Sequence, residues 1–205
     1  MNCPLCKSSN THLFHKQIFY RCGNCDLIFK DTSVWPSQEQ EKQRYLKHHN
    51  SIDDKGYRSF LLELVDPLVK LLKPGMNILD YGCGPLPALS ELVREKGFDC
   101  KNYDLYFYNN EKLFSQKYDF IICSEVVEHF RDPESEFKKL FGLLLDGGSL
   151  VVRTNLVPDD FNSWWYHSDL THLVFYSNST LEWIAKKHNA QLVLWQNNIV
   201  VMTKP

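Results

Sequence analysis

Residues 77–93, NILDYGCGPLPALSELV, join an apolar segment to an amphipathic one through a turn that contains two glycines. The pattern predicts a buried strand over residues 77–81 and a helix over residues 87–96. Glycine at positions 82 and 84 lets the backbone bend tightly and approach a ligand without an intervening side chain. Because the N-terminal amides of the helix point toward the same turn, we expect Gly82 and Gly84 to border a ligand site.

Strands and helices alternate on both sides of this stretch. Residues 58–72 have apolar side chains at helical spacing, which Pro67 interrupts as a kink or restart. Further elements are expected as follows: strands over residues 98–104, 118–125 and 149–155, a helix from an Asp132 N-cap to Gly147 and Gly148, a helix opened by the capping box at 179–182 and reaching about Asn189, and a C-terminal hairpin over 190–196 and 198–205. This alternation predicts an α/β fold with a mostly parallel sheet, helices on both faces and a C-terminal antiparallel hairpin.

Length and composition set the broad class of the protein. A chain of 205 residues with 43% hydrophobic residues suits one ordinary domain and a small appendage. No apolar run approaches the roughly 20 residues that span a bilayer, and the N-terminus does not resemble a signal peptide, so a cytoplasmic location without membrane contact is expected. A net charge of −2 disfavours a broad nucleic-acid surface, although a local basic patch is compatible with it.

Four of the seven cysteines form two pairs near the N-terminus, Cys3-x-x-Cys6 and Cys22-x-x-Cys25. Fifteen residues separate the pairs, a spacing typical of two knuckles that present four thiolates to zinc. Four sulfur ligands leave no open coordination position, so the predicted Zn²⁺ is structural, and unliganded cysteines are the alternative. We therefore expect a zinc ribbon over residues 1–30.

The remainder of the chain divides into two parts. Residues 31–56 are polar and are expected to form a connector with a short solvated helix. Residues 57–205 contain the alternating strands and helices and form the main domain.

Acidic residues at the ends of two predicted strands indicate the ligand. Pro85 and Pro87 stand where a dinucleotide-binding turn would need backbone donors or glycine, so pyrophosphate is disfavoured. Asp80 would repel a phosphate and attract an ammonium or sulfonium group, while Asp104 is placed to accept hydrogen bonds from ribose hydroxyls. S-adenosylmethionine combines these features. The plainer alternative is an ordinary glycine turn followed by a loop aspartate.

Four motifs carry a family resemblance: ILDYGCG at 78–84, YDL at 103–105, DFIICSEVVEHF at 119–130 and LLLDGGSLVVRTN at 143–155. Together they resemble the class I S-adenosylmethionine-dependent methyltransferases, which have a Rossmann-like fold, over roughly residues 57–205. The E-x-x-E-H run is similar to that of the branch that includes ubiquinone-biosynthesis O-methyltransferases. The resemblance implies the following cofactor contacts: Asp80, Tyr81, Gly82 and Gly84 at the methionine part, Asp104 at the ribose, and Ser124 and Glu125 near the reactive methyl group.

One part of the chain departs from this family pattern. Only thirteen residues, 105–117, separate Asp104 from the next strong strand, where the family usually has a helix, a third strand and an acidic residue that contacts adenine. We expect an abbreviated segment there. Tyr106, Phe107 and Phe114 are candidates for stacking on the adenine, with packing roles as the alternative.

Residues 161–177, FNSWWYHSDLTHLVFYS, are rich in Trp, Tyr and His and follow the last parallel strand, so we expect them to form a lid over the site. Methyl transfer needs alignment and, for a protonated acceptor, a base. His172 is the first candidate for that base, with Asp169 as its orienting partner, and His167 is the second. In the alternative, these histidines satisfy buried hydrogen bonds in a packed loop.

The predicted function is methyl transfer from S-adenosylmethionine to a small-molecule acceptor, a sugar or an aromatic metabolite. Two alternatives stay open. One is RNA or protein methylation with the zinc ribbon reading the substrate, and the other is a non-catalytic zinc-ribbon interaction protein. The sequence does not specify the oligomeric state.

Overall fold

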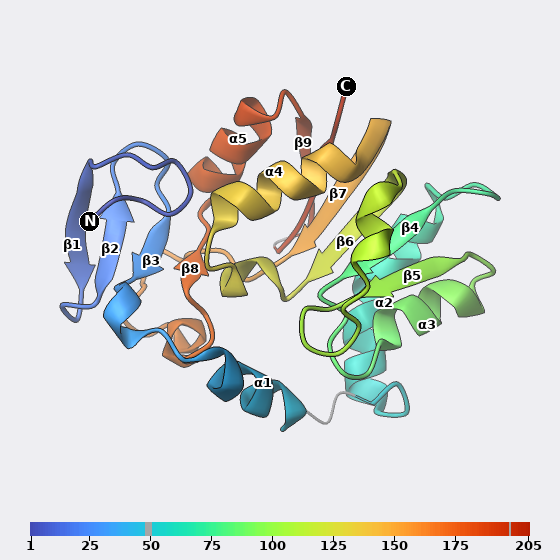
Figure 1. The fold of residues 1–205 in the computed structure, drawn as a ribbon, viewed down its shortest axis with the longest axis horizontal. Coiled ribbons are helices and arrows are strands. Elements are labelled where there is room, and N and C mark those ends of the chain that lie inside the picture. The colour runs from blue at the N-terminus through green and yellow to red at the C-terminus, as the bar shows by residue number, and fades with distance from the viewer. Residues whose placement is uncertain (48–50, 197) are drawn as a thin grey trace.

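The computed structural model describes residues 1–47, 51–196 and 198–205, and it contains one large and one small β-sheet (Figure 1). The large sheet consists of β4 (Ile78–Tyr81), β5 (Cys100–Tyr103), β6 (Tyr118–Ser124), β7 (Leu144–Arg153), β9 (Gln191–Gln196) and β10 (Ile199–Thr203). Its strand order is β5-β4-β6-β7-β10-β9. The first four strands are parallel, and β10 is antiparallel to both of its neighbours, which confirms the predicted sheet and hairpin.

Helices cover both faces of the large sheet, as predicted. On one face, α2 (Lys55–Val69) and α3 (Ala88–Glu95) pack against strand residues such as Ile122. On the other face, α4 (Pro133–Leu143) and α5 (Asn178–Lys187) pack against residues such as Cys123. Ile122 and Cys123 are neighbours on β6 that point to opposite faces, and both are fully buried, so the central strand is apolar on both sides.

Two helix boundaries differ from the prediction. Helix α4 begins at Pro133 after its Asp132 N-cap as expected, but it ends at Leu143 rather than at the glycine pair. Leu144 is already the first residue of β7, where it pairs with Tyr118 and is buried, so sheet formation displaces the last helical turn. Helix α5 is capped by Ser177, which accepts a hydrogen bond from Thr180 N–H, and not by the predicted box at 179–182.

Helix α2 continues to Val69 with Pro67 inside it. A proline in the last helical turn interrupts the hydrogen-bond ladder only near its end, where few bonds remain to be lost. Four of its apolar residues, Leu61, Leu64, Val65 and Leu68, are buried against the sheet.

The segment between β5 and β6 is short, as predicted. Residues 104–117, all of which the structure describes, contain the 3-10 helix η2 (Glu111–Ser115) and no strand. The edge of the large sheet at β5 therefore lacks a further strand within the described chain.

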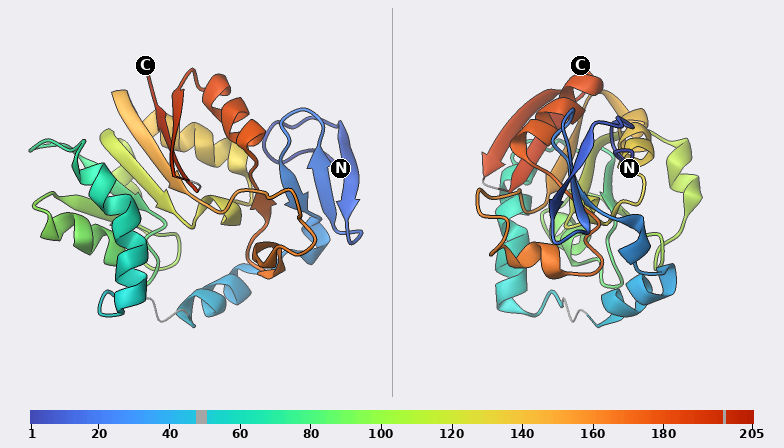
Figure 2. Two further views of the ribbon diagram at one scale, coloured as in Figure 1. Left: turned by 180° about the vertical axis from the view of Figure 1, so that it is seen from behind. Right: turned by 90° about the vertical axis from the view of Figure 1, so that its left-hand side faces the viewer.

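The small sheet joins the N-terminal segment to the main domain. It has the order β1-β2-β3-β8, with β1 (Thr11–His15), β2 (Phe19–Cys22), β3 (Ile28–Lys30) and β8 (Val174–Phe175). Strand β8 comes from the histidine-containing segment late in the chain and pairs with β3 (Figure 2). The N-terminal cysteine-bearing segment therefore shares a sheet with two residues of the predicted lid, Val174 and Phe175.

The polar connector contains η1 (Thr32–Val34) and α1 (Gln38–Leu46), and residues 48–50 of the connector lie outside the described residues. The predicted solvated helix is mostly exposed, but Glu41 on α1 is only 4% exposed because α1 lies against the main domain. No helix in the described ranges is both long and apolar enough to cross a membrane.

Candidate functional site

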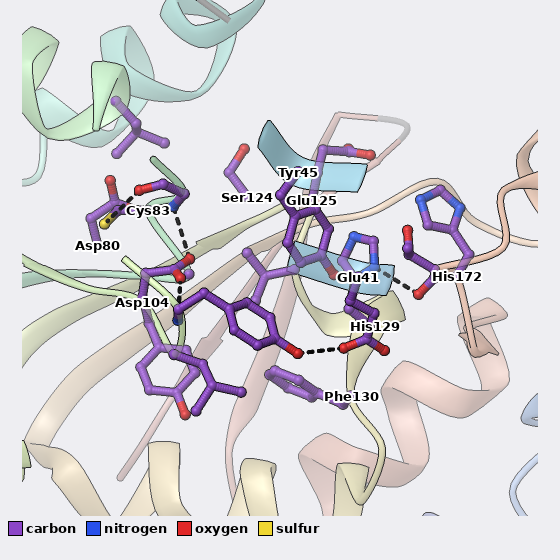
Figure 3. Close-up of a pocket in the computed structure, with 18 of the residues that line it drawn as sticks. Glu41, Tyr45, Asp80, Cys83, Asp104, Ser124, Glu125, His129, Phe130 and His172 are labelled. Carbon is purple, nitrogen blue, oxygen red and sulfur yellow. Dashed lines mark hydrogen bonds between the residues drawn. The ribbon is translucent and has the colours of Figure 1, made fainter. Parts of the chain in front are cut away.

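A cavity of about 880 Å³ lies at the carboxyl ends of β4, β5 and β6. Such edges are where parallel α/β sheets bind their ligands. All seven residues that the sequence predicts at the cofactor line this cavity: Asp80, Tyr81, Gly82, Gly84, Asp104, Ser124 and Glu125. In Figure 3, Asp80 and Asp104 lie toward one end of the cavity and His129 and His172 toward the other, with Ser124 and Glu125 between them.

The glycine turn is held tightly at the first end. Gly82 has a φ of +84°, and a Cβ atom on it would lie 2.6 Å from both γ carbons of Val126. Gly84 has a φ of +67°, and its N–H donates to Asp104 Oδ2 over 3.0 Å. The other oxygen of Asp104 accepts from Tyr106 N–H over 2.8 Å. Asp104 therefore fixes the turn, and it lies at the position predicted for ribose contact.

Asp80 is the least satisfied charged group at this end of the cavity. The residue is 3% exposed, and its Oδ2 atom has no hydrogen-bond partner among the described residues. Burial, helped by the negative charge of Asp104, raises the pKa of Asp80 to about 7. A buried carboxylate oxygen without a donor suits a cationic ligand, so these residues fit the ammonium or sulfonium of S-adenosylmethionine.

Two glutamates and a tyrosine form a buried network in the middle of the site. The hydroxyl of Tyr166 lies 2.5 Å from Glu128 Oε1 and 3.0 Å from Glu125 Oε2. Thr154 Oγ1 donates to Glu128 Oε2 over 3.0 Å. Burial, together with the repulsion between the two carboxylates, raises the pKa of Glu125, and burial also raises that of Glu128.

Glu125 differs from Glu128 in its access to the cavity. It has a φ of +54°, a left-handed conformation that non-glycine residues rarely adopt and that often marks functional sites. Its Oε1 atom has no hydrogen-bond partner in the part of the chain that the structure describes, whereas both oxygens of Glu128 accept hydrogen bonds. Glu125 therefore offers an oxygen for a ligand.

Two histidines stand together beyond the glutamates. The Nδ1 atom of His129 lies 2.7 Å from the carbonyl oxygen of Thr171, and Nδ1 of His172 lies 2.8 Å from that of Tyr166. A carbonyl only accepts, so both Nδ1 atoms donate, and the Nε2 atoms carry the free lone pairs. Burial lowers the pKa of His172 to about 3 and also lowers that of His129. Both rings are therefore neutral at pH 7.

The remaining predicted residues of the lid have other surroundings. Asp169 accepts from Arg44 over 2.8 Å and from the Thr171 hydroxyl over 2.7 Å. Although burial acts in the opposite direction, these hydrogen bonds lower the pKa of Asp169. The Asp169 carboxylate borders the cavity, but it does not orient the His172 ring, whose Nδ1 proton goes to the carbonyl oxygen of Tyr166. The contact between the two residues is the backbone hydrogen bond from His172 N–H to Asp169 O over 3.3 Å.

His167 is not among the cavity residues. It is 4% exposed and packs against the rings of Phe161 at 4.8 Å and Phe19 at 5.4 Å between centroids. The structure therefore places His172 and Asp169 at the cavity and His167 in a cluster of aromatic side chains beside it.

Helix α1 contributes residues that sequence reasoning assigned to a solvated connector. Glu41 accepts from the hydroxyl of Tyr106 and from Arg131 Nη2, both over 2.6 Å. Arg44 and Tyr45 of the same helix also line the cavity. The polar composition of α1 concealed this role, because an ion pair with a distant residue leaves no local pattern. Glu128 was visible in the E-x-x-E-H run but received no role.

The four N-terminal cysteines come together as predicted. The Sγ atoms of Cys3 and Cys25 are 3.5 Å apart, those of Cys6 and Cys22 are 3.4 Å apart, and all four lie within 4.8 Å of one another. Zn–S bonds of about 2.3 Å in a tetrahedron place sulfurs about 3.8 Å apart. The arrangement therefore fits a Zn²⁺ ion with a closed coordination shell.

Solved structures similar to this one include methyltransferases and a protein whose name states no activity. The PH0226 protein from Pyrococcus horikoshii OT3 is 16% identical with a TM-score of 0.55, and the alignment covers 80% of this chain and 98% of that one. An O-methyltransferase family protein from Burkholderia thailandensis is 13% identical with a TM-score of 0.51, covering 84% of this chain and 64% of that one. CalO1, a methyltransferase in calicheamicin biosynthesis solved in its SAH-bound form, is 11% identical with a TM-score of 0.50, covering 73% of this chain and 55% of that one.

At such low sequence identities, these structural similarities show that the proteins share a fold. The chain spans less than two thirds of the length of the latter two proteins. No curated protein matches the sequence. A family model described as a methyltransferase domain matches residues 52–194, which is more than half of the chain. The strand order, the glycine turn and this match agree, and the protein belongs to the methyltransferase domain family.

Proposed function

We propose that the protein transfers a methyl group from S-adenosylmethionine to a small-molecule acceptor, a sugar or an aromatic metabolite. The observation that carries the proposal is the unpaired, buried oxygen of Asp80 beside the glycine turn, in a cavity that continues to Glu125 and the two histidines. One end suits a cationic amino acid tail, and the other has polar groups suited to an acceptor.

Residues at the first end would hold the cofactor. Asp80 would pair with its positive charge, and the turn at Gly82 and Gly84 lets the backbone approach its methionine part. Asp104 Oδ1 already accepts from the N–H groups of Tyr106 and Phe107, whereas Oδ2 accepts only from Gly84 N–H, so Oδ2 retains a lone pair that would accept from a ribose hydroxyl. When bound, S-adenosylmethionine supplies a methyl group on a positively charged sulfur.

Glu125 is our preferred proton acceptor for the methylated group. Glu125 lines the cavity between the cofactor end and the histidines (Figure 3). Its buried Oε1 has no hydrogen-bond partner among the described residues, and the Tyr166 hydroxyl lies 3.0 Å from Oε2. Its raised pKa brings the carboxylate closer to the working pH, which favours proton transfer. His172 is the alternative base suggested by the sequence, but a neutral imidazole with a pKa of about 3 takes up a proton weakly.

The cavity favours a small acceptor over a polymer. Helix α1 covers one side of the cavity through Glu41, Arg44 and Tyr45, and the segment that contains Trp165 and Tyr166 covers another. The description of CalO1 as a methyltransferase in calicheamicin biosynthesis supports a small-molecule acceptor, and the O-methyltransferase name of the Burkholderia thailandensis protein supports oxygen as the methylated atom. The E-x-x-E-H run supports a place near the ubiquinone-biosynthesis O-methyltransferase branch.

We also propose that residues 1–30 form a structural zinc ribbon and that residues 57–205 form the catalytic domain, joined by the connector at 31–56. The short sulfur–sulfur distances support the presence of the metal. The pairing of β3 with β8 supports a structural role, in which the ribbon holds the segment that contains β8 in place. Reduced thiolates are typical of the cytoplasm, the location we propose.

Calorimetry with the zinc-loaded protein tests the cofactor first. S-adenosylmethionine should bind at one site, and absence of binding would contradict the methyl-transfer proposal. Labelled S-adenosylmethionine incubated with the protein and fractionated cell extract should then place label in small molecules. Label in RNA or protein would instead support the reader function of the ribbon.

Substitution then separates the two candidate bases. Glu125→Gln should lower kcat by about 100-fold or more and remove the alkaline rise of the kcat profile, because it keeps the hydrogen bond with Tyr166 but does not accept a proton. His172→Gln should retain that pH profile. The reverse pattern would assign the base to His172.

A further inference from the structure

Three ligating side chains meet beside the cavity outside the zinc ribbon. Glu128 Oε1, His129 and His172 offer ligand atoms that all lie within 4.8 Å of one another, and we call them the Glu-His-His cluster. Glu128 Oε1 and His129 Nε2 are 3.9 Å apart. The two imidazole rings are 4.9 Å apart between centroids at an angle of 67°.

Backbone carbonyls orient both histidines as they do in metal sites. Metal-binding histidines generally donate one ring N–H to a carbonyl or carboxylate, which fixes the tautomer and directs the other nitrogen at the ion. His129 donates from Nδ1 to Thr171, and His172 donates from Nδ1 to Tyr166. Both Nε2 lone pairs are therefore available to an ion.

Hydrogen bonds also orient the carboxylate of the cluster. Glu128 is fully buried, and it accepts hydrogen bonds from Tyr166 and Thr154. A carboxylate oxygen has two lone pairs, so Glu128 Oε1 can retain the tyrosine hydrogen bond while it ligates an ion. Hydrogen bonds of this kind to a ligating carboxylate are a regular feature of metal centres.

We propose that the Glu-His-His cluster binds a divalent transition-metal ion of the Zn²⁺ type, with at least one coordination position open to the cavity. Two imidazole nitrogens and one carboxylate oxygen form a ligand set of open Zn²⁺ sites, in contrast to the four thiolates of a closed structural site. His129 and His172 line the cavity and Glu128 lies behind them, so the open position faces the space for the acceptor.

Ion binding requires only a small contraction of the cluster. Ligand atoms around a tetrahedral ion with bonds of about 2.0–2.2 Å stand about 3.3–3.6 Å apart. The present separations all lie within 4.8 Å, so the side chains need to move inward by no more than about 1 Å.

Binding of an ion to the Glu-His-His cluster does not depend on the proposed methyl transfer. A role of the ion in catalysis, however, rests on that proposed function. A bound ion would hold an oxygen of the acceptor and lower the pKa of a coordinated hydroxyl. The favoured acceptors would then carry a metal-binding oxygen next to the methylated group, as vicinal diols and catechols do.

Titration with Zn²⁺ alone tests the site. Protein with the ribbon loaded, confirmed by its zinc content, is titrated with Zn²⁺ in a calorimeter without cofactor or acceptor. We expect one further equivalent to bind to the wild type. Failure of the ribbon-loaded wild type to take up that equivalent would overturn the proposal, whatever the outcome for S-adenosylmethionine.

Variants locate the second ion. We expect the affinity for the second ion to fall by at least about 100-fold in each of three variants, Glu128→Gln, His129→Gln and His172→Gln. Replacing even a residue that only hydrogen-bonds to a metal ligand lowers metal affinity by about 10- to 100-fold. His12→Gln, an exposed histidine on β1, is the matched control and should bind like the wild type. Retention of the second equivalent in both His129→Gln and His172→Gln would place the ion elsewhere and contradict the proposal.

Cobalt substitution in the wild type covers the case in which a variant does not fold. Co²⁺ in the ribbon gives thiolate charge-transfer absorption, whereas Co²⁺ at the Glu-His-His cluster should add visible ligand-field bands without further thiolate absorption. The site would be refuted if the second Co²⁺ added thiolate bands, or if no second Co²⁺ bound at all. Binding of S-adenosylmethionine, measured on the same preparations, reports separately on the proposed function.

Discussion

The ammonium group of Lys30 on β3 donates to the backbone carbonyl oxygen of Asp169 over 2.6 Å. Lys30 is 5% exposed, and its own backbone N–H donates to Leu173 O over 2.9 Å. Burial lowers the pKa of Lys30 to about 8, although the charge of Asp169 acts in the opposite direction. The last strand of the cysteine-bearing segment thus holds both ends of the stretch that carries His172.

Loss of the ribbon metal should therefore loosen that stretch. We expect Cys25→Ser to abolish zinc retention and to increase hydrogen exchange over residues 169–175, because a small ribbon does not hold its strands without the metal. Cys83→Ser, outside the ribbon, should retain both zinc and protection. Unchanged exchange at 169–175 in zinc-free Cys25→Ser would show that the ribbon does not support the site.

A side chain at Gly82 should destabilise the protein both through the backbone conformation and through a clash with Val126. Gly75 has a similar conformation without a clash, so a substitution there separates the two effects. Gly82→Ala combines a positive φ with Cβ contacts of 2.6 Å to Val126, and we expect a loss of about 2–5 kcal/mol in stability. Gly75→Ala has a similar φ of +86° but open space around it, so it should cost about 1–2 kcal/mol.

Denaturant unfolding measures both effects, and Val126→Ala should recover part of the Gly82→Ala loss in a double-mutant cycle. Equal costs at Gly75 and Gly82, or additive effects of Gly82→Ala and Val126→Ala, would mean that the close approach to Val126 is unimportant.

Cofactor affinity should depend on the ionisation of Asp80. The pKa of Asp80 is raised to about 7 in the absence of ligand, and a cation binds the ionised form more tightly. Affinity should rise with pH up to about pH 7.5, by as much as tenfold per unit below pH 6. The amino group of the cofactor limits the window, because it titrates near pH 8.

Calorimetry across pH 5.5–7.5 tests this dependence. Asp80→Asn should bind weakly with a flat profile, and Asp99→Asn, an exposed control, should keep the profile of the wild type. A steep profile in Asp80→Asn would assign the titration to another group.

The attachment of α1 to the main domain should depend on Glu41. Glu41→Ala removes the acceptor for Tyr106 and Arg131, and we expect a loss of about 1–3 kcal/mol in stability, since Arg131 stays partly exposed and can be resolvated. KM for S-adenosylmethionine should rise with it, because α1 lines the cavity.

Glu39→Ala on the exposed side of the same helix is the control, because it changes helix composition without touching the cavity. Equal effects of Glu39→Ala and Glu41→Ala on stability and KM would attribute the change to helix propensity and exclude the buried ion pair as its cause.

Local patterns in the sequence determined the layered α/β fold, the glycine turn and the approach of the four cysteines. Each depends on neighbours in the chain: apolar residues define β6, and the paired spacing brings the thiols of Cys3 and Cys6 into one cluster. The carboxyl-end rule then placed Asp80 and Asp104 at one edge of the sheet, since parallel strands end on the same side.

Tertiary structure alone decided which polar residues are buried together. Glu41 and Arg131 are 90 residues apart, and Lys30 and Asp169 are 139 apart, so no local pattern records their contacts. The same applies to His172, which shares a cluster with Glu128 and His129, whereas His167, five residues earlier, packs among aromatic rings. Ligation and pKa depend on distance and desolvation in the folded chain, and these arise only when distant segments pack.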